Sequence, residues 1–262
     1  MSAQPSGARA VLEVRDVSVN FGGIIALDGV SFEVPRGGIL GLIGPNGAGK
    51  TTLFNCLSRL YVPSSGDILF DGRTILSTPA HRMARLGIGR TFQNLALFHR
   101  LTVLDNVKVG AHCSSGTDFL SNALRMPWVR RDEARLERKA WELLEYLELT
   151  AVAHLPTAGL PFGTQKRVEL ARALAADPKL LLLDEPAGGL NHEEVDELGK
   201  LFQKIRDDRR LTVLLVEHHM SLVMAISEQV VVLNFGRKIA EGTPDEVRAN
   251  PEVVHAYLGT KH

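Results

Sequence analysis

The residues most able to do chemistry lie in one glycine-rich run. The run is Gly44-Pro45-Asn46-Gly47-Ala48-Gly49-Lys50-Thr51, followed by Thr52, and it satisfies the pattern G-x-x-x-x-G-K-[ST]. Glycines let successive backbone N–H groups converge on phosphate oxygens, and the N-terminus of a following helix adds a positive dipole end. Lys50 would add a full charge at the outer phosphates, and the Thr51 hydroxyl would bind Mg²⁺. The run therefore predicts a nucleotide-phosphate site.

Two adjacent carboxylates form a second candidate group. Asp184 and Glu185 directly follow the run Leu180-Leu181-Leu182-Leu183, which is typical of a strand buried in a parallel sheet. Such sheets bind ligands at the carboxyl ends of their strands. Asp184 suits a metal ion, directly or through water, and Glu185 is placed to polarise an attacking water. Without the glycine-rich run, the pair could simply cap the next helix.

A histidine pair follows another apolar run. Residues 211–216 lead into Glu217-His218-His219, and a histidine there could donate to a γ-phosphate or hold the attacking water. On its own, His218 could equally be a structural or surface residue. The doublet could also indicate a metal site, but no cysteine or further histidine lies near it, so we do not expect zinc.

These groups need a parallel sheet to bring them together. An apolar strand at 39–43 precedes the glycine-rich run, and a helix with apolar residues at Leu53, Phe54, Leu57 and Leu60 follows it. Alternating segments at 11–21 and 26–34 predict an antiparallel layer before that unit. Residues 101–150 are polar with helical spacing and predict an inserted helical segment. Asn191, followed by Glu194, and Thr243, followed by Pro244, predict helix starts.

The predicted fold class is α/β: a P-loop NTPase core with an antiparallel β layer and an inserted helical subdomain. Its expected organisation is a mobile tail over 1–10, the ATP-binding core with the antiparallel layer over 11–93 and 166–241, the helical subdomain over 94–165, and C-terminal helices over 242–262.

Composition limits the function classes. The 262 residues include 30 Lys plus Arg and 30 Asp plus Glu, so no global field favours nucleic acid, and any anion site must be local. The two cysteines, Cys56 and Cys113, form no ligand or disulfide pattern, which fits a reducing compartment. Neither a membrane span nor a signal peptide is evident, so we expect a soluble, cytoplasmic chain that could still dock on a membrane protein.

Together these motifs resemble the ATP-binding cassette of ABC transporters, over nearly the whole chain. Arg90-Thr91-Phe92-Gln93 is similar to the family's Q-loop, Leu160-Pro161-Phe162-Gly163-Thr164-Gln165 occupies the position of its signature motif, and Ala187-Gly188-Gly189-Leu190-Asn191 resembles its D-loop. The resemblance implies that ATP is the substrate and Mg²⁺ the cofactor. It also implies that Phe21 stacks on adenine, that Gln93 links metal and water to a membrane subunit, and that His218 is the switch histidine. Phe21 could instead be a core residue of its strand.

A narrower resemblance is to the LivG-type ATPases of branched-chain amino acid importers. It rests on residues 89–107, 183–191, 216–227 and 241–259. It implies a homodimer, or a heterodimer with a second cassette, that sandwiches ATP and sits on permease subunits at the inner face of the membrane. A solute-binding protein would act indirectly, and no nucleic acid is involved. Related cassettes serve urea, amide and other importers, and the motifs do not separate these solutes.

The signature loop departs from the family pattern Leu-Ser-Gly-Gly-Gln. Pro161 stands at the serine position and Thr164 at the glutamine position, while Gly163 remains, as do the N–H groups after it. Proline removes one hydroxyl and one N–H from a loop that would face the γ-phosphate held by the opposite subunit, so we expect a weakened site that still works. His219 is a second departure, because the family usually has aspartate there.

Two other classes of protein remain as alternatives. A P-loop kinase or switch GTPase is disfavoured by the absence of an Asn-Lys-x-Asp motif and by the signature-like loop before Arg167. A non-transport ABC protein is disfavoured because such proteins generally carry two cassettes, coiled-coil arms or long linkers. The sequence therefore predicts a transport ATPase.

Overall fold

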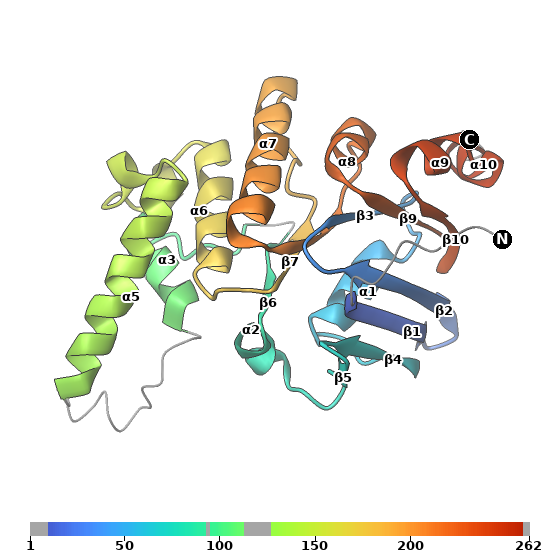
Figure 1. Cartoon of the computed structure of the whole chain (residues 1–262), viewed down its shortest axis with the longest axis horizontal. Helices are drawn as coiled ribbons and strands as arrows, with labels where there is room; N and C mark the ends of the chain where they lie inside the picture. Colours follow the sequence, from blue (N-terminus) through green and yellow to red (C-terminus); the bar gives the residue numbers. More distant parts are fainter. Residues whose placement is uncertain (1–9, 93–94, 113–126, 259–262) are drawn as a thin grey trace.

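The computed structural model of the chain describes residues 10–92, 95–112 and 127–258 (Figure 1). Its first sheet is antiparallel, with the strand order β2-β1-β4-β5. These strands are β1 (Ala10–Phe21), β2 (Ile24–Pro35), β4 (Ser65–Phe70) and β5 (Arg73–Thr74). The antiparallel layer expected from the alternating sequence is present, and its second strand is longer than the predicted range.

The second sheet carries the sequence's chemistry and has the order β10-β9-β3-β8-β7-β6. Its strands are β3 (Ile39–Ile43), β6 (Ile88–Arg90), β7 (Leu180–Asp184), β8 (Thr212–Val216), β9 (Gln229–Asn234) and β10 (Arg237–Gly242). Only the β9–β10 pair is antiparallel, and the other neighbours are parallel. Every residue of β3, β7 and β8 is buried, as the apolar runs predict.

Helices cover the parallel sheet on both faces (Figure 1). The α-helices are α1 (Lys50–Leu57), α2 (Met83–Leu86), α3 (Val103–Ala111), α5 (Pro127–Tyr146), α6 (Phe162–Leu174), α7 (His192–Arg209), α8 (Met220–Ile226), α9 (Pro244–Ala249) and α10 (Pro251–Leu258). Three-residue 3₁₀ turns span Ala80–Arg82, Thr150–Val152 and Thr157–Gly159. Both predicted helix starts are confirmed, because Asn191 with Glu194 and Thr243 with Glu246 form capping boxes.

Alternate residues of the central strands serve two cores. Leu40 and Leu42 of β3 face the core between the two sheets, which also holds Leu53 and Phe54 of α1. Ile39 and Ile43 face the other core, together with residues of α3, α5, α6, α7 and α8. This two-sided burial fixes the register of the strands, because a strand buried on both faces cannot slip without exposing apolar side chains. The register in turn fixes where the loops after the strands begin.

One predicted helical position is wrong. The apolar spacing placed Leu60 in the first helix, but α1 ends at Leu57 and Leu60 is 54% exposed. The backbone of Arg59 is left-handed, with φ of +61°, which ends the helix before Leu60.

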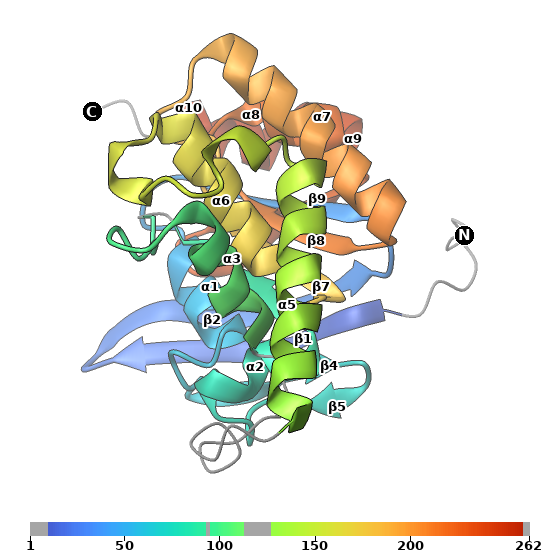
Figure 2. The ribbon, with the colours of Figure 1, turned by 90° about the vertical axis from the view of Figure 1, so that its left-hand side faces the viewer.

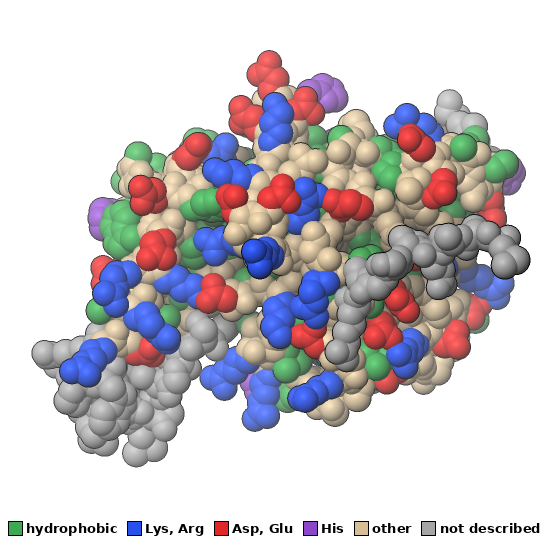
Figure 3. Space-filling view, in the orientation of Figure 1, with side chains coloured by type: hydrophobic (Ala, Val, Ile, Leu, Met, Phe, Trp, Pro, Cys, Tyr) green, Lys and Arg blue, Asp and Glu red, His purple; other side chains and the backbone are tan. Residues whose placement is uncertain are grey.

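The helices α3, α5 and α6 lie side by side at one end of the molecule (Figure 2). Leu136, Ala140, Leu143 and Leu144 are the buried apolar face of α5, as their spacing predicts. None of the described helices is long and apolar enough to cross a bilayer. Acidic and basic side chains are interspersed over the face in Figure 3, in keeping with equal numbers of the two.

Candidate functional site

The glycine-rich loop joins β3 to α1, and two of its glycines are required by close contacts. Gly44 has φ of +154°, and a Cβ there would lie 2.2 Å from the Leu233 carbonyl oxygen. Gly49 has φ of +100°, and a Cβ there would lie 2.7 Å from the Ala26 carbonyl oxygen. Gly49 is also the N-cap of α1, and no side chain caps this helix. The first N–H groups of α1 are therefore available to an anion.

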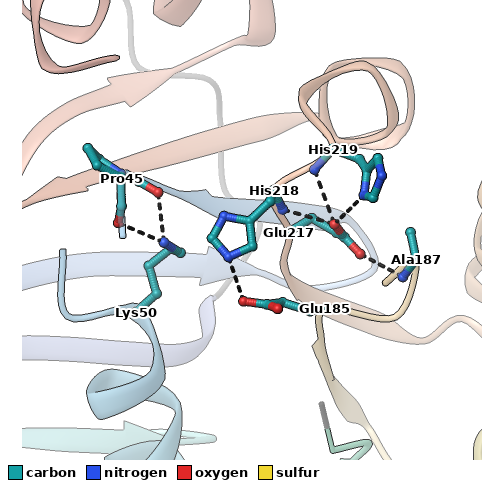
Figure 4. Close-up of polar contacts among 8 residues, drawn as sticks. Pro45, Lys50, Glu185, Ala187, Glu217, His218 and His219 are labelled. Carbon is teal, nitrogen blue, oxygen red and sulfur yellow. Dashed lines mark hydrogen bonds and ion pairs between the residues drawn. The ribbon is translucent and has the colours of Figure 1, made fainter. Parts of the chain in front are cut away.

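Lys50 is held inside the loop before any ligand arrives. The residue is only 5% exposed, and Nζ donates to the carbonyl oxygens of Gly44 at 2.7 Å and Pro45 at 3.0 Å (Figure 4). Burial lowers the pKa of Lys50, and the charge of Glu185 partly opposes that effect. The ammonium is thus oriented by the loop and electrostatically coupled to the carboxylate across the site.

A cavity of about 750 Å³ joins the loop to the two strand ends. Its walls are Ile24, Ile25, Ala26, Asn46, Gly47, Ala48, Gly49, Lys50, Thr51, Thr52, Glu185 and His218. The parallel neighbours β3, β8 and β7 end at this edge, so their following loops converge here as predicted. A single cavity therefore contains a phosphate-type loop, a carboxylate and an imidazole.

Glu185 and His218 contact each other in the wall of the cavity. His218 Nε2 lies 2.6 Å from Glu185 Oε1 (Figure 4). Glu185 adopts φ of +48°, an uncommon conformation for a residue with a side chain, and its N–H donates to the Val216 carbonyl at 2.9 Å. The Glu185 carboxylate thus lies against the His218 ring in the loop that follows β7.

Asp184 is oriented by an arginine that the sequence argument did not single out as a site residue. Arg90 Nη2 donates to Asp184 Oδ2 at 2.8 Å, and both side chains are nearly buried. Arg90 also donates to Asn55 at 3.0 Å and Ser58 at 2.8 Å, near the end of α1. Burial raises the pKa of Asp184 and Arg90 opposes that effect. The arginine thus ties β6, β7 and α1 together beneath the cavity.

Phe21 lies at the end of β1 and is 46% exposed. Its ring meets Tyr61 edge-on, with ring centroids 5.3 Å apart. The apolar wall of the cavity comes instead from Ile24, Ile25 and Ala26. Phe21 is therefore no core residue, and its assignment to adenine remains a prediction.

The signature-like loop lies apart from this cavity. Phe162 begins α6, and the N-cap Pro161 supplies no side-chain hydrogen bond. Pro161, Gly163 and Thr164 line a separate hollow of about 210 Å³ against α7. Within this one chain, the structure does not bring the loop to Lys50, Glu185 or His218.

Gln93 lies outside the described residues, but its surroundings are described. The N–H groups of Phe92 and Ala96 lie 3.1 and 3.4 Å from Glu169 Oε1. Glu169 is a buried carboxylate of α6, and Arg172 of the same helix donates to the Ala96 carbonyl. The helix that begins at the signature-like loop therefore holds the backbone on both sides of Gln93.

Comparison with known families decides what this arrangement belongs to. The family described as "ABC transporter" matches residues 27–188, and the family described as "Branched-chain amino acid ATP-binding cassette transporter" matches residues 237–262. The chain belongs to the ABC transporter family. The resemblance inferred from its motifs is confirmed, as is the fold class, and the chain is an ABC transporter ATPase.

Relatives of this cassette span it almost end to end. It is 44% identical to BraF of Pseudomonas aeruginosa and 41% identical to LivG of Escherichia coli, each covering 96% of this chain and 99% of the relative. Both are named high-affinity branched-chain amino acid transport ATP-binding proteins.

Solved structures of other cassettes share its fold. The crystal structure of the ADP conformation of an ABC transporter cassette has a TM-score of 0.83 at 30% identity, covering 96% of this chain and 99% of that one. A nucleotide-free cassette has a TM-score of 0.81, also at 30% identity, covering 95% and 99%.

Proposed function

We propose that this ATPase uses MgATP to power import of branched-chain amino acids through separate permease subunits, docked at the inner face of the membrane. The match of residues 237–262 to the branched-chain amino acid family carries the choice of solute. Sequence identity of 35% does not distinguish between solutes. A sulfate/thiosulfate import protein of Pseudomonas syringae and an archaeal LivG are both 35% identical to the chain. Urea, amides and other polar solutes are the alternatives.

ATP would place its phosphates against the loop between β3 and α1. Residues 46–51, which include the open N-terminus of α1, line the cavity, and Lys50 supplies the full positive charge. Lys50 would exchange its bonds to the Gly44 and Pro45 carbonyls for bonds to phosphate oxygens. Because its charge is already buried and directed, little reorganisation is needed on binding.

Magnesium would suit two oxygen donors, of which Thr51 lines the cavity and Asp184 is buried next to the lining residue Glu185. Thr51 offers a hydroxyl from the first turn of α1, and Asp184 offers a carboxylate with one oxygen held by Arg90. These are hard oxygen ligands, which Mg²⁺ prefers. When bound, the ion would neutralise charge on the β- and γ-phosphates, and Gln93 would contribute a further oxygen.

Glu185 would act on the attacking water. A water between Glu185 and the γ-phosphate gives its proton to the carboxylate as its oxygen bonds to phosphorus, and the bond from phosphorus to the ADP oxygen breaks. His218 Nε2, 2.6 Å from Glu185 Oε1, would orient the carboxylate and contact the γ-phosphate.

A second cassette would complete the site. The signature-like loop, residues 160–165, lies outside the cavity of its own chain. A head-to-tail pair would bring the Gly163 and Thr164 N–H groups of one copy to the nucleotide of the other. The pair would be this chain with itself or with a related cassette, closed by ATP and opened by hydrolysis.

The proposal can be tested with a reconstituted transporter. The chain is co-expressed with its permease subunits and assayed in vesicles with the cognate solute-binding protein. Leucine, isoleucine and valine are expected to stimulate ATP hydrolysis and accumulate, whereas urea, amides and sulfate are not. Stimulation by one of the latter alone would overturn the solute assignment.

Glu185→Gln should retain ATP and trap a dimer, and wild-type turnover in that variant would remove Glu185 from its role.

A further inference from the structure

Glu217 is a buried carboxylate between the two loops that carry Glu185 and His218, and the proposed chemistry does not use it. It follows β8 directly, and its residue is only 2% exposed. Its Oε1 accepts the N–H of Ala187 at 2.6 Å, and its Oε2 accepts the N–H of His218 at 2.9 Å (Figure 4). His219 adds its N–H and its Nδ1, both 3.2 Å from Oε2.

These bonds join two separate segments of chain. Ala187 lies two residues after Glu185 and opens the D-loop-like run, residues 187–191. His218 follows Glu217 directly, and its ring reaches back to Glu185. One carboxylate therefore grips the backbone on both sides of the 2.6 Å contact between Glu185 and His218.

We propose that Glu217 is a positioning residue for ATP hydrolysis: its two carboxylate oxygens set the separation of Glu185 and His218 by binding the backbones that carry them. This inference rests on the proposed roles of Glu185 and His218. It adds a third carboxylate, which is not among the residues that line the cavity, and links the D-loop-like run to the switch histidine.

A simpler explanation is that Glu217 only caps α8, which begins at Met220. A carboxylate that caps a helix accepts N–H groups of its first turn, whereas Glu217 accepts those of His218 and of the N-cap His219, which precede α8. The bond to Ala187 does not fit a capping role either, because Ala187 is 30 residues away in sequence and belongs to the loop after β7. Of the four contacts, the shortest is this long-range one.

The chemistry of the site explains why a carboxylate is needed. The groups around Glu217 are N–H donors, and a carboxylate has two acceptor oxygens and no hydrogen to clash with them. Glutamine at this position would turn an NH₂ group toward at least one N–H, leaving a buried donor unpaired. The unpaired donor would shift the two loops relative to each other. Small displacements of reacting groups reduce rates strongly.

The test is the Glu217→Gln substitution in an otherwise wild-type assembly, which is purified and assayed for ATP hydrolysis. We expect kcat to fall on the order of 10- to 100-fold while KM for ATP changes less than about threefold, because positioning of the reacting groups is lost and the phosphate-binding loop is untouched. His219→Ala keeps every backbone contact of Glu217 and should lower kcat less than about threefold. Should Glu217→Gln fail to fold, Glu217→Asp shortens the same carboxylate by one methylene and is judged by the same criteria.

The matched control is Glu228→Gln at the opposite end of the same sheet. Glu228 also accepts a backbone N–H, that of Ile39, but it lies away from the cavity. Both variants should lose some thermal stability, and only the change at Glu217 should lower kcat. Equal kcat in the two variants would show that Glu217 is merely structural and would overturn the inference.

A double variant separates this inference from the proposed function. If Glu217 acts through Glu185, then Glu217→Gln together with Glu185→Gln should be no slower than Glu185→Gln alone. Multiplied losses would overturn the positioning role. Wild-type turnover in Glu185→Gln itself would instead count against the proposed function, so the two failures are distinguishable.

Discussion

The glycine-rich loop, residues 44–51, and the signature-like loop, residues 160–165, both lead into a helix, yet their surroundings differ. The first loop buries Lys50, closes around carbonyl oxygens and faces a cavity completed by Glu185 and His218. The second begins with exposed Pro161 and lines a small hollow together with Leu190 and α7. One chain therefore assembles the glycine-rich end alone, whereas the signature end would gain its counterpart from the proposed second cassette.

The largest expected effect comes from breaking the assembled end. Lys50→Ala should lower ATP turnover at least about 10²- to 10³-fold, because a buried, oriented charge at the phosphates is removed. Nucleotide binding, followed with a fluorescent ATP analogue, should weaken with it. The matched control is Lys179→Ala, which removes an exposed lysine paired with Asp71 and should stay within about twofold of wild type. Similar losses in both variants would contradict the comparison.

The glycines of the two loops should respond in opposite ways. Gly49→Ala puts a methyl group 2.7 Å from a backbone oxygen at φ of +100°, and should cost about 1–3 kcal/mol of unfolding free energy or more. Gly163→Ala meets nothing closer than Glu194 Oε1 at 3.5 Å, and alanine favours the helix by up to about 1 kcal/mol. Urea denaturation measures both effects.

Gly163→Ala should nevertheless turn over ATP more slowly. Its new methyl group would lie on the surface that is proposed to meet the partner's nucleotide. A variant that is both more stable and as active as wild type would show that this surface does not contact ATP.

Pro161→Ser should restore hydrogen-bond donors to the signature-like loop. ATP turnover of the assembled transporter should rise on the order of tenfold. Pro161 has the extended backbone of an N-cap residue, so serine fits without rearrangement and returns both a hydroxyl and an N–H. Pro161→Ala returns only the N–H, so its ATP turnover should lie between those of wild type and Pro161→Ser. An unchanged or lower rate in Pro161→Ser would reject a weakened signature loop.

The smallest expected effect is a pH dependence at Glu169, which joins α6 to the segment around Gln93. Burial raises the pKa of Glu169, while the N–H groups of Phe92 and Ala96 and the charges of Lys166 and Arg172 oppose the rise. The folded state therefore binds the proton more tightly than the unfolded state, whose pKa is about 4.3. Stability contributed by this group should fall as pH rises from that value through the folded pKa.

Urea unfolding of wild type and Glu169→Gln at pH 5 and pH 8 measures this dependence. The unfolding free energy of wild type relative to the variant should be lower at pH 8. A difference that is the same at both values, or larger at pH 8, would contradict the assignment.

Much of the glycine-rich end could be predicted because its signals are local. The glycine-rich run, the apolar strands β7 and β8, and the polar residues just after them are contiguous in sequence, and parallel packing brings their ends together. Arg90 and Glu217 could not be assigned in this way. The partners of Arg90 include Asp184, 94 residues away, and those of Glu217 include Ala187, 30 residues away, so their roles exist only in the folded chain.

The strand order also has a consequence for how the chain folds. In β3, Ile39 pairs with Val213 and Leu40 with Gln229, so the strand that launches the phosphate-binding loop finds both neighbours near the other end of the chain. Contacts this distant in sequence are expected to slow folding, because closing the long intervening loop costs conformational entropy. The proposed ATP site exists only when this sheet is complete, so ATP should bind native molecules and not partly folded ones. ATP should therefore raise the free energy of unfolding by mass action.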